Sequence, residues 1–220
     1  MSRSKVERIA RALRAAYGEP DLAGEARRPV LDQLIHTLLS QKTTSASCRL
    51  AFERLKAIGD WDTVARAGVS AVVEAIRPAG LAEQKALWIL TALERATERF
   101  GAPSLEPLRE WPDSEVVAYL STFPGAGPKT RACVLLFALG RQALPVDTHV
   151  YRVTRRLGLL APEVPIARAQ VELESLVPPR LRGLFHVGLY EHGRRVCRSQ
   201  RPHCANCTLS DLCPASRALV

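Results

Sequence analysis

The sequence predicts an all-α fold. Apolar residues recur at helical spacing along almost the whole chain, and no segment shows the strict alternation of a half-buried strand. Glycine and proline cluster at short intervals between the periodic stretches, where they end one helix and allow the next to begin. With 220 residues, the chain can bury a substantial core in one or two domains.

The N-terminal half contains a run of amphipathic stretches. The first stripe runs from Val6 to Tyr17, and a more apolar helix from Val30 to Leu39 is entered through Pro29. A third helix is expected around Cys48–Leu55, whose apolar positions keep the same period. Further helices are expected at residues 63–67, 71–76, 83–100 and 114–120, separated by glycine or proline at 59, 78–80 and 101–103.

The C-terminal half opens with the most apolar segment of the chain. Residues 129–139 are nearly all apolar after the first turn, which predicts a central helix. Amphipathic helices are then expected at 148–157, 166–176 and 181–192, the last two separated by Pro178 and Pro179.

Charge is the next informative property. The net charge is +9, and arginine supplies 26 of the 31 basic residues. This excess favours a polyanionic partner, although codon bias would also produce arginine richness. No apolar run reaches the ~18–20 residues of a membrane span, and no signal core follows the first residues. We therefore expect a cytoplasmic, monomeric protein with no membrane partner.

Four cysteines gather near the C-terminus. Cys197, Cys204, Cys207 and Cys213 follow the spacing C-x6-C-x2-C-x5-C, whose thiolates suit either tetrahedral zinc or an iron–sulfur cluster. The spacing alone does not choose between these two metals. Disulfides are not expected in the cytosol, so the four read as metal ligands. Cys48 and Cys133 are isolated in apolar stretches and are expected to be buried packing residues.

A second motif is the segment Phe123–Lys129, which reads FPGAGPK. Gly125 and Gly127 permit backbone conformations closed to other residues, and Pro128 suits the first turn of a new helix. The free N–H groups of such a helix start can bind phosphate. An ordinary helix–turn–helix joint would need the same residues, but the full pattern resembles the helix–hairpin–helix DNA-binding motif.

Lys129 and Asp147 are the candidate catalytic residues. A cation in the first turn of a helix faces the positive end of the macrodipole, which favours the neutral amine that a nucleophile must be. A lysine that contacts phosphate, or is only solvated, would fit the same position. Asp147 or Thr148 would cap the next helix. The carboxylate of Asp147 could also accept a proton or stabilise positive charge on a sugar ring.

The chain resembles the endonuclease III family, the iron–sulfur DNA glycosylases of the helix–hairpin–helix superfamily. The resemblance extends from about residue 30 to 214 and rests on Leu38–Gln41 (LLSQ), Phe123–Lys129, Val146–His149 (VDTH) and the four-cysteine loop. It implies a [4Fe-4S] cluster and damaged double-stranded DNA as the partner. It also implies attack of Lys129 on C1′ of a flipped nucleotide, assistance from Asp147, and strand cleavage by β-elimination.

The resemblance also implies a domain division and a set of DNA contacts. A helical barrel domain would span residues 29–141, and a discontinuous cluster domain 1–28 and 142–220, with a DNA-binding cleft between them. One departure lies at Lys42, where many family members have glutamine, so either Gln41 or Lys42 could fill the gap left by the flipped base. The expected DNA-binding residues are Gln41, Lys42, Leu81, Gly125, Gly127, Thr130, His149 and Arg152.

Two other functions are compatible with these motifs. A non-catalytic DNA-binding protein could keep the hairpin and use its cluster as a redox sensor. A monofunctional mismatch glycosylase would share the cluster, but members of that group lack a lysine at the Lys129 position. The preferred expectation is a bifunctional glycosylase and AP lyase that removes oxidised pyrimidines.

Overall fold

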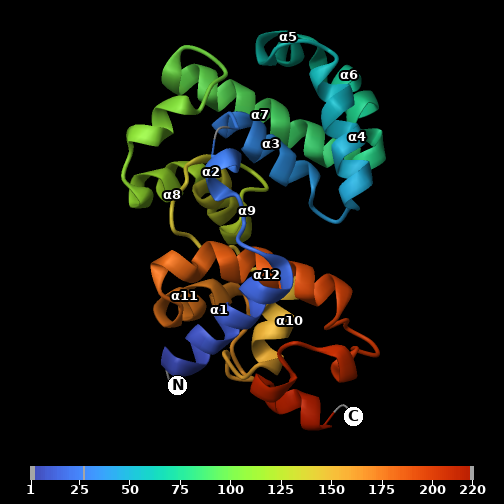
Figure 1. The fold of residues 1–220 in the computed structure, drawn as a ribbon. Helices are drawn as coiled ribbons and strands as arrows, with labels where there is room; N and C mark the ends of the chain where they lie inside the picture. The colour runs from blue at the N-terminus through green and yellow to red at the C-terminus, as the bar shows by residue number, and fades with distance from the viewer. Residues whose placement is uncertain (1–2, 27, 219–220) are drawn as a thin grey trace. The chain divides into compact units, whose positions relative to one another are not determined.

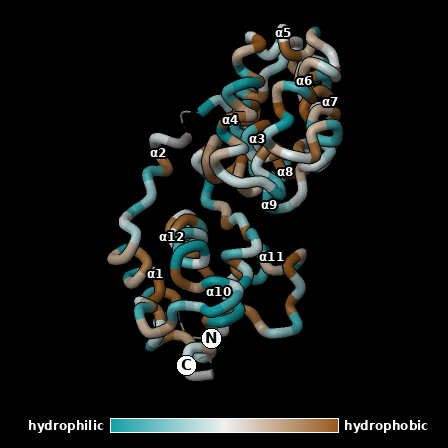
Figure 2. The backbone as a smooth tube through the Cα atoms, turned by 90° about the vertical axis from the view of Figure 1, so that its right-hand side faces the viewer, coloured by the Kyte–Doolittle hydropathy of each residue, from teal (hydrophilic) through white to brown (hydrophobic). Residues whose placement is uncertain are grey.

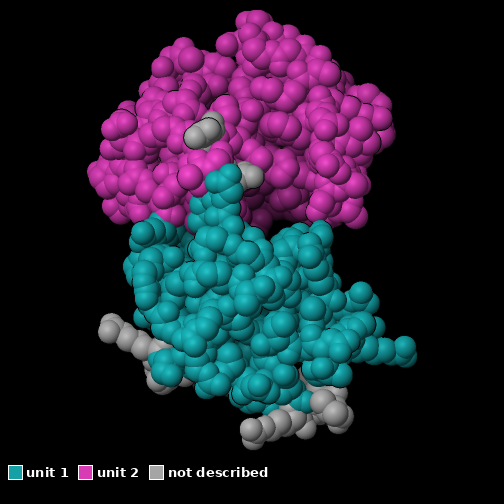
Figure 3. All heavy atoms as spheres, viewed as in Figure 1, with its two compact units in different colours: residues 1–22, 142–220 teal, residues 23–141 magenta. Residues whose placement is uncertain are grey.

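The computed structural model describes residues 3–26 and 28–218, and these residues form helices and turns without a strand (Figure 1). The all-α prediction is confirmed. The chain divides into two compact units, one of residues 1–22 and 142–220 and the other of residues 23–141 (Figure 3). The boundaries between the two units lie at residues 22/23 and 141/142.

The unit of residues 23–141 is built around a buried helix, α3 (Val30–Leu39). Every residue of this helix except Asp32 and His36 is buried, and it packs against α4, α7 and α9. Pro29 precedes its first turn, as the sequence predicted. The other helices are α4 (Ser45–Lys56), α5 (Trp61–Arg66), α6 (Gly68–Ile76), α7 (Ala82–Phe100), α8 (Asp113–Ser121) and α9 (Pro128–Cys133), with 3-10 turns at Arg77–Ala79 and Glu106–Glu110.

The other unit is built around α12 (Arg182–Arg195), which packs against α1 (Arg3–Tyr17) and α10 (Thr148–Arg156). Gly188 of α12 allows α1 to approach closely, because a Cβ atom there would lie 3.1 Å from the Cβ of Leu13. The unit also contains α11 (Ile166–Leu176) and four 3-10 turns at Pro179–Leu181, Cys204–Asn206, Ser210–Leu212 and Pro214–Ala218.

Most predicted helices have counterparts within a few residues, and Figure 2 shows hydrophobic and hydrophilic stretches alternating along them, as amphipathic helices require. The exception is the segment at 129–139, where the α-helix ends at Cys133 and a π-helical turn covers Val134–Ala138. A short helix, α2 (Leu22–Glu25), was not predicted. In the described part of the chain, no helix is both long enough and apolar enough to cross a bilayer.

Candidate functional site

The hairpin predicted at residues 123–129 is present between α8 and α9. The N–H of Ala126 donates to the carbonyl of Phe123 at 3.1 Å, which closes the turn. Gly125 has φ +78°, and a Cβ atom there would lie 2.5 Å from the indole ring of Trp88. Only glycine fits at this position, both for its backbone and for its space. Gly127 differs from the prediction: its φ of −64° is ordinary, and open space surrounds the position of a Cβ atom.

Lys129 lies in the first turn of α9, directly after Pro128, and is partly buried. Burial lowers the pKa of His36 in α3 below its ordinary value of 6.5, and the charges of Arg28 and Lys129 lower it further. The Lys129 ammonium therefore lies within electrostatic reach of α3. Cys48 and Cys133 are buried, as predicted for packing residues.

Gln41 connects the end of α3 to the hairpin. Its side-chain Nε2 donates to the carbonyl of Gly125 at 2.8 Å and lies 3.3 Å from the hydroxyl of Thr130. The Thr130 side chain is only 3% exposed, so it faces the hairpin and not the surface. Of the residues predicted to contact DNA in this unit, Lys42 and Leu81 have exposed side chains.

Asp147 caps α10, because its Oδ1 accepts the N–H of Val150 at 2.8 Å. The sequence allowed either Asp147 or Thr148 as the N-cap of this helix, and in the structure the N-cap is Asp147. The carboxylate is partly buried and keeps its second oxygen outside this cap bond. It belongs to the unit of residues 1–22 and 142–220, whereas Lys129 belongs to the other unit.

Arg152 and His149, which the sequence predicted as DNA contacts, have partners within their own unit. The guanidinium of Arg152 donates to the carbonyls of Gly193 at 2.8 Å and Cys197 at 3.1 Å. Its terminal nitrogen also lies 3.3 Å from Nδ1 of His149, whose ring meets Tyr190 edge to face. These contacts attach the cysteine segment to α10. These contacts could not be predicted from the sequence, because the carbonyl partners are more than 40 residues away.

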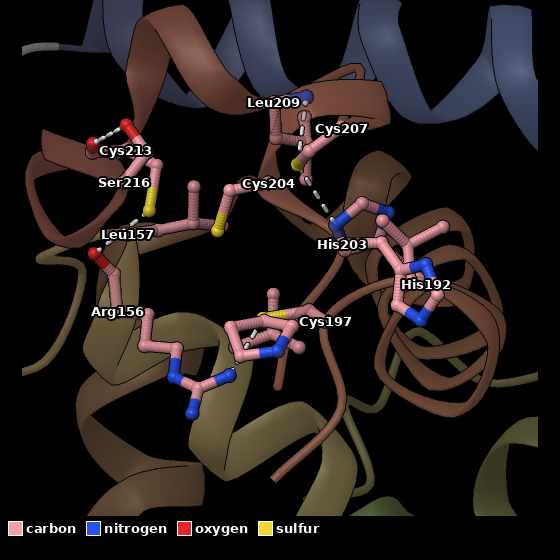
Figure 4. A pocket seen from close by; sticks show the side chains of 13 residues that line it. Arg156, Leu157, His192, Cys197, His203, Cys204, Cys207, Leu209, Cys213 and Ser216 are labelled. Carbon is pink, nitrogen blue, oxygen red and sulfur yellow. Dashed lines mark hydrogen bonds between the residues drawn. The ribbon is translucent and has the colours of Figure 1, made fainter. Parts of the chain in front are cut away.

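The four cysteines of the C-terminal segment line one pocket, together with apolar side chains that include Val153, Leu157 and Leu209 (Figure 4). Burial raises the pKa of the Cys207 and Cys213 thiols, and the neighbouring cysteines raise both further. Within the described residues, no three His, Cys, Asp or Glu side chains are grouped closely enough to hold a metal ion.

Several N–H groups point at the cysteine sulfurs. The Cys207 sulfur accepts the backbone N–H of Leu209 at 3.4 Å, and a guanidinium nitrogen of Arg156 lies 3.3 Å from the Cys197 sulfur. Nε2 of His192 lies 3.4 Å from the Cys207 sulfur. Burial lowers the pKa of His192 to about 4, so its ring is neutral at neutral pH.

One residue that sequence reasoning missed is Lys85 of α7. It is fully buried, with 0% exposure, and its ammonium donates to the carbonyls of Leu39, Gln41 and Ala79. The sequence places it in an amphipathic helix among charged residues, where a lysine normally faces water. The sequence singles out Lys85 in one way only: lysine is rare in this chain, which has five.

The chain was compared with known proteins. Residues 35–179 match the HhH-GPD superfamily base excision DNA repair protein family. The chain is 32% identical over 181 residues to endonuclease III of Thermotoga maritima, covering 82% of this chain and 80% of that protein. It is 38% identical over 177 residues to an Arabidopsis thaliana protein provisionally named as a DNA glycosylase, of which the match covers 60%.

Solved structures show the same fold. A non-covalent endonuclease III–DNA complex superimposes with a TM-score of 0.84 at 24% identity, over 99% of this chain and 98% of that one. The family match spans more than half of the chain, and the Thermotoga relative aligns over most of both proteins. The chain therefore belongs to the HhH-GPD superfamily of base excision DNA repair proteins and, within it, to the endonuclease III family.

Proposed function

We propose that this DNA glycosylase of base excision repair removes oxidised pyrimidines from duplex DNA and then cleaves the strand as an AP lyase, with Lys129 as the nucleophile. The position of Lys129 carries the proposal. It follows a tight hairpin at once, and the open space beside Gly127 leaves room for a DNA backbone. Lys129 is also partly buried, so its side chain lies against the protein and does not extend freely into water.

The reaction begins when the target nucleotide is flipped out of the base stack. Nζ of Lys129 attacks C1′ while the bond from C1′ to the base breaks, and the base leaves with the bonding electrons and gains a proton. The carboxylate of Asp147 would stabilise positive charge on the sugar or accept the proton that the amine loses. Opening of the sugar ring then gives a Schiff base between Lys129 and C1′.

Strand cleavage follows from the same intermediate. Loss of a proton from C2′ drives β-elimination, which breaks the bond from C3′ to its phosphate oxygen. Water then hydrolyses the Schiff base and frees the lysine. These steps use no residue of the cysteine segment.

Borohydride trapping tests this mechanism, because the reagent reduces the Schiff base to a stable covalent adduct. We expect an adduct between the wild type and a duplex that contains an abasic site or thymine glycol. Lys129→Ala should give none. Lys56→Ala is the matched control, since Lys56 is a partly exposed lysine that stacks over Trp61 at 4.3 Å in the same unit.

Three results would contradict the proposal in different ways. Base release without any adduct would favour a monofunctional glycosylase. DNA binding with neither base release nor adduct would favour the non-catalytic alternative. An adduct that survives Lys129→Ala would place the nucleophile elsewhere.

We also propose that Cys197, Cys204, Cys207 and Cys213 hold a [4Fe-4S] cluster. The residues fit this group: four thiols line one pocket, and N–H donors point at two of the sulfurs, as is favourable for cluster thiolates. The cluster would organise the segment and supply no bond-breaking step.

The metal can be identified in the purified protein. We expect the broad visible absorption of an iron–sulfur cluster and about four iron and four sulfide per chain. Cys204→Ser should lower both. A colourless protein that carries one zinc per chain would contradict the proposal.

A further inference from the structure

Lys85 is a buried cation whose bonding capacity is completely used. An ammonium has three N–H donors and no acceptor. Its nitrogen lies 2.7 Å from the carbonyl of Leu39, 2.7 Å from that of Gln41 and 2.9 Å from that of Ala79. Burial lowers the pKa of Lys85, so keeping the charge inside the unit has a cost that the three carbonyls offset.

The three carbonyls belong to two separate turns. Leu39 and Gln41 lie at the end of α3, and Ala79 ends the 3-10 turn that precedes α7. One side chain therefore ties together two turns that are about 40 residues apart in the sequence. Among the described residues, no backbone hydrogen bond joins residues 39–42 to residues 77–81.

Each of these turns presents a strained, exposed residue. Among the described residues, three that are not glycine have positive φ: Lys42 at 52°, Leu81 at 50° and Arg201 at 49°. Two of the three lie next to the residues that Lys85 binds: Lys42 directly follows Gln41, and Leu81 lies two residues after Ala79. The apolar side chain of Leu81 is also 50% exposed, so it does not contribute to the hydrophobic core of the unit. Left-handed backbone at such residues persists only where the surroundings fix it, and it is typical of functional sites.

The side chain of Gln41 is bound elsewhere. Its amide donates to the carbonyl of Gly125, while the backbone carbonyl of Gln41 accepts from Lys85. The exposed side chain of this turn is therefore Lys42. The same contacts connect the turn to the hairpin that carries Lys129.

We propose that Lys85 is a positioning residue that holds the Lys42 turn and the Leu81 turn as one rigid element, which enters the base stack of bound DNA. Apolar side chains such as leucine can insert between base steps. The ammonium of a lysine can donate hydrogen bonds to base edges. The inference rests on the proposed function, because it assigns the element to extrusion of the target nucleotide. It also assigns Lys42, and not Gln41, as the side chain that occupies the gap.

The test compares substrates that do and do not require extrusion. Lys85→Met keeps the length and apolar stem of the side chain but removes all three donors. On duplex DNA with an abasic site, we expect borohydride trapping to slow by roughly 10- to 100-fold. On a single-stranded abasic oligonucleotide, which needs no unstacking, the rate should change by less than about twofold. Lys56→Met is the matched control and should leave both rates unchanged.

A fluorescent base analogue beside the lesion reports extrusion directly. The wild type should raise 2-aminopurine fluorescence in the duplex, and Lys85→Met should reduce this rise. Equal loss of trapping on both substrates would overturn the inference, because it would indicate a general structural role. Failure of the wild type to form an adduct on the abasic duplex would instead contradict the proposed Lys129 chemistry, so the two failures can be distinguished.

If Lys85→Met does not fold, the exposed residues still decide the question. Lys42→Ala, Leu81→Ala and the double variant change surface side chains only. If the two turns act as one element, their effects on the duplex rate should be non-additive, with the double variant less impaired than the product of the single effects. Additive effects would show that the turns act separately and would overturn the inference.

Discussion

At the scale of single residues, the two glycines of the hairpin have different physical roles although they are two positions apart. Gly125 needs both a left-handed backbone and the absence of a Cβ, because the Trp88 ring packs against it. Gly127 needs neither for folding. Because Gly127 has no side chain, a ligand such as a DNA phosphate can approach its backbone closely.

Alanine substitutions should separate these roles. Gly125→Ala should lower the free energy of unfolding by about 1–3 kcal/mol, because alanine is strained at φ +78° and its methyl group would meet the indole ring. Gly127→Ala should leave stability unchanged or raise it by up to ~1 kcal/mol, since its φ suits any residue. Urea unfolding of both variants is the measurement. Equal destabilisation would refute the assignment.

Single residues also show which features of the protein could be predicted from the sequence and which could not. The capping role of Asp147 could be predicted, because a helix start is a local feature. The burial of Lys85 could not, since its partners are carbonyls at residues 39, 41 and 79, and nothing local distinguishes it from a surface lysine. The same holds for the partners of Arg152, which are the carbonyls of residues 193 and 197.

At the scale of elements, hydrophobic periodicity located helices well where one face is polar. It was less informative at residues 134–138, where nearly every side chain is apolar and no polar face fixes the helical phase. There the chain forms a π-helical turn directly after α9. Such turns often accompany functional sites, and this one follows the helix that carries Lys129.

Arginines of α10 bind the start of the cysteine segment, which covers residues 197–213. Arg156 donates to the carbonyls of Arg198 and Ser199 and lies against the Cys197 sulfur. Arg152 binds the start of the segment. Since the segment buries few large apolar side chains of its own, these bonds order its first turn.

Removing the Arg156 clamp should loosen the segment without unfolding the unit. In Arg156→Met, we expect backbone amides of residues 197–201 to exchange hydrogen roughly tenfold faster, as local opening costs less. Arg155→Met is the matched control, because Arg155 binds the carbonyl of Pro162 and not the segment. Exchange that is unchanged in Arg156→Met, or equally faster in both variants, would show that the clamp is unimportant.

At the scale of the whole molecule, the net charge of +9 is only partly available to DNA. Arg152 and Arg156 donate hydrogen bonds to backbone carbonyls of the chain, and Arg195 forms an ion pair with Glu191 at 2.7 Å. Arg201 is exposed, with a left-handed backbone, and forms no ion pair among the described residues. The composition predicts that the electrostatic potential of the protein is positive. Only the structure distinguishes arginines that bind the chain from arginines that are available to bind DNA.

Salt titration of DNA binding can measure this separation. Each phosphate that a protein neutralises contributes about −0.9 to the slope of log K against log salt, because bound counterions are released. Arg201→Gln should therefore make the slope less steep by about 1, with uniformly weaker binding across sequences. Arg152→Gln should leave the slope unchanged, because its guanidinium is already bound to Gly193 and Cys197. If Arg152→Gln flattened the slope and Arg201→Gln did not, the division into structural and free arginines would be wrong. The basic residues of the cysteine segment would then need another role.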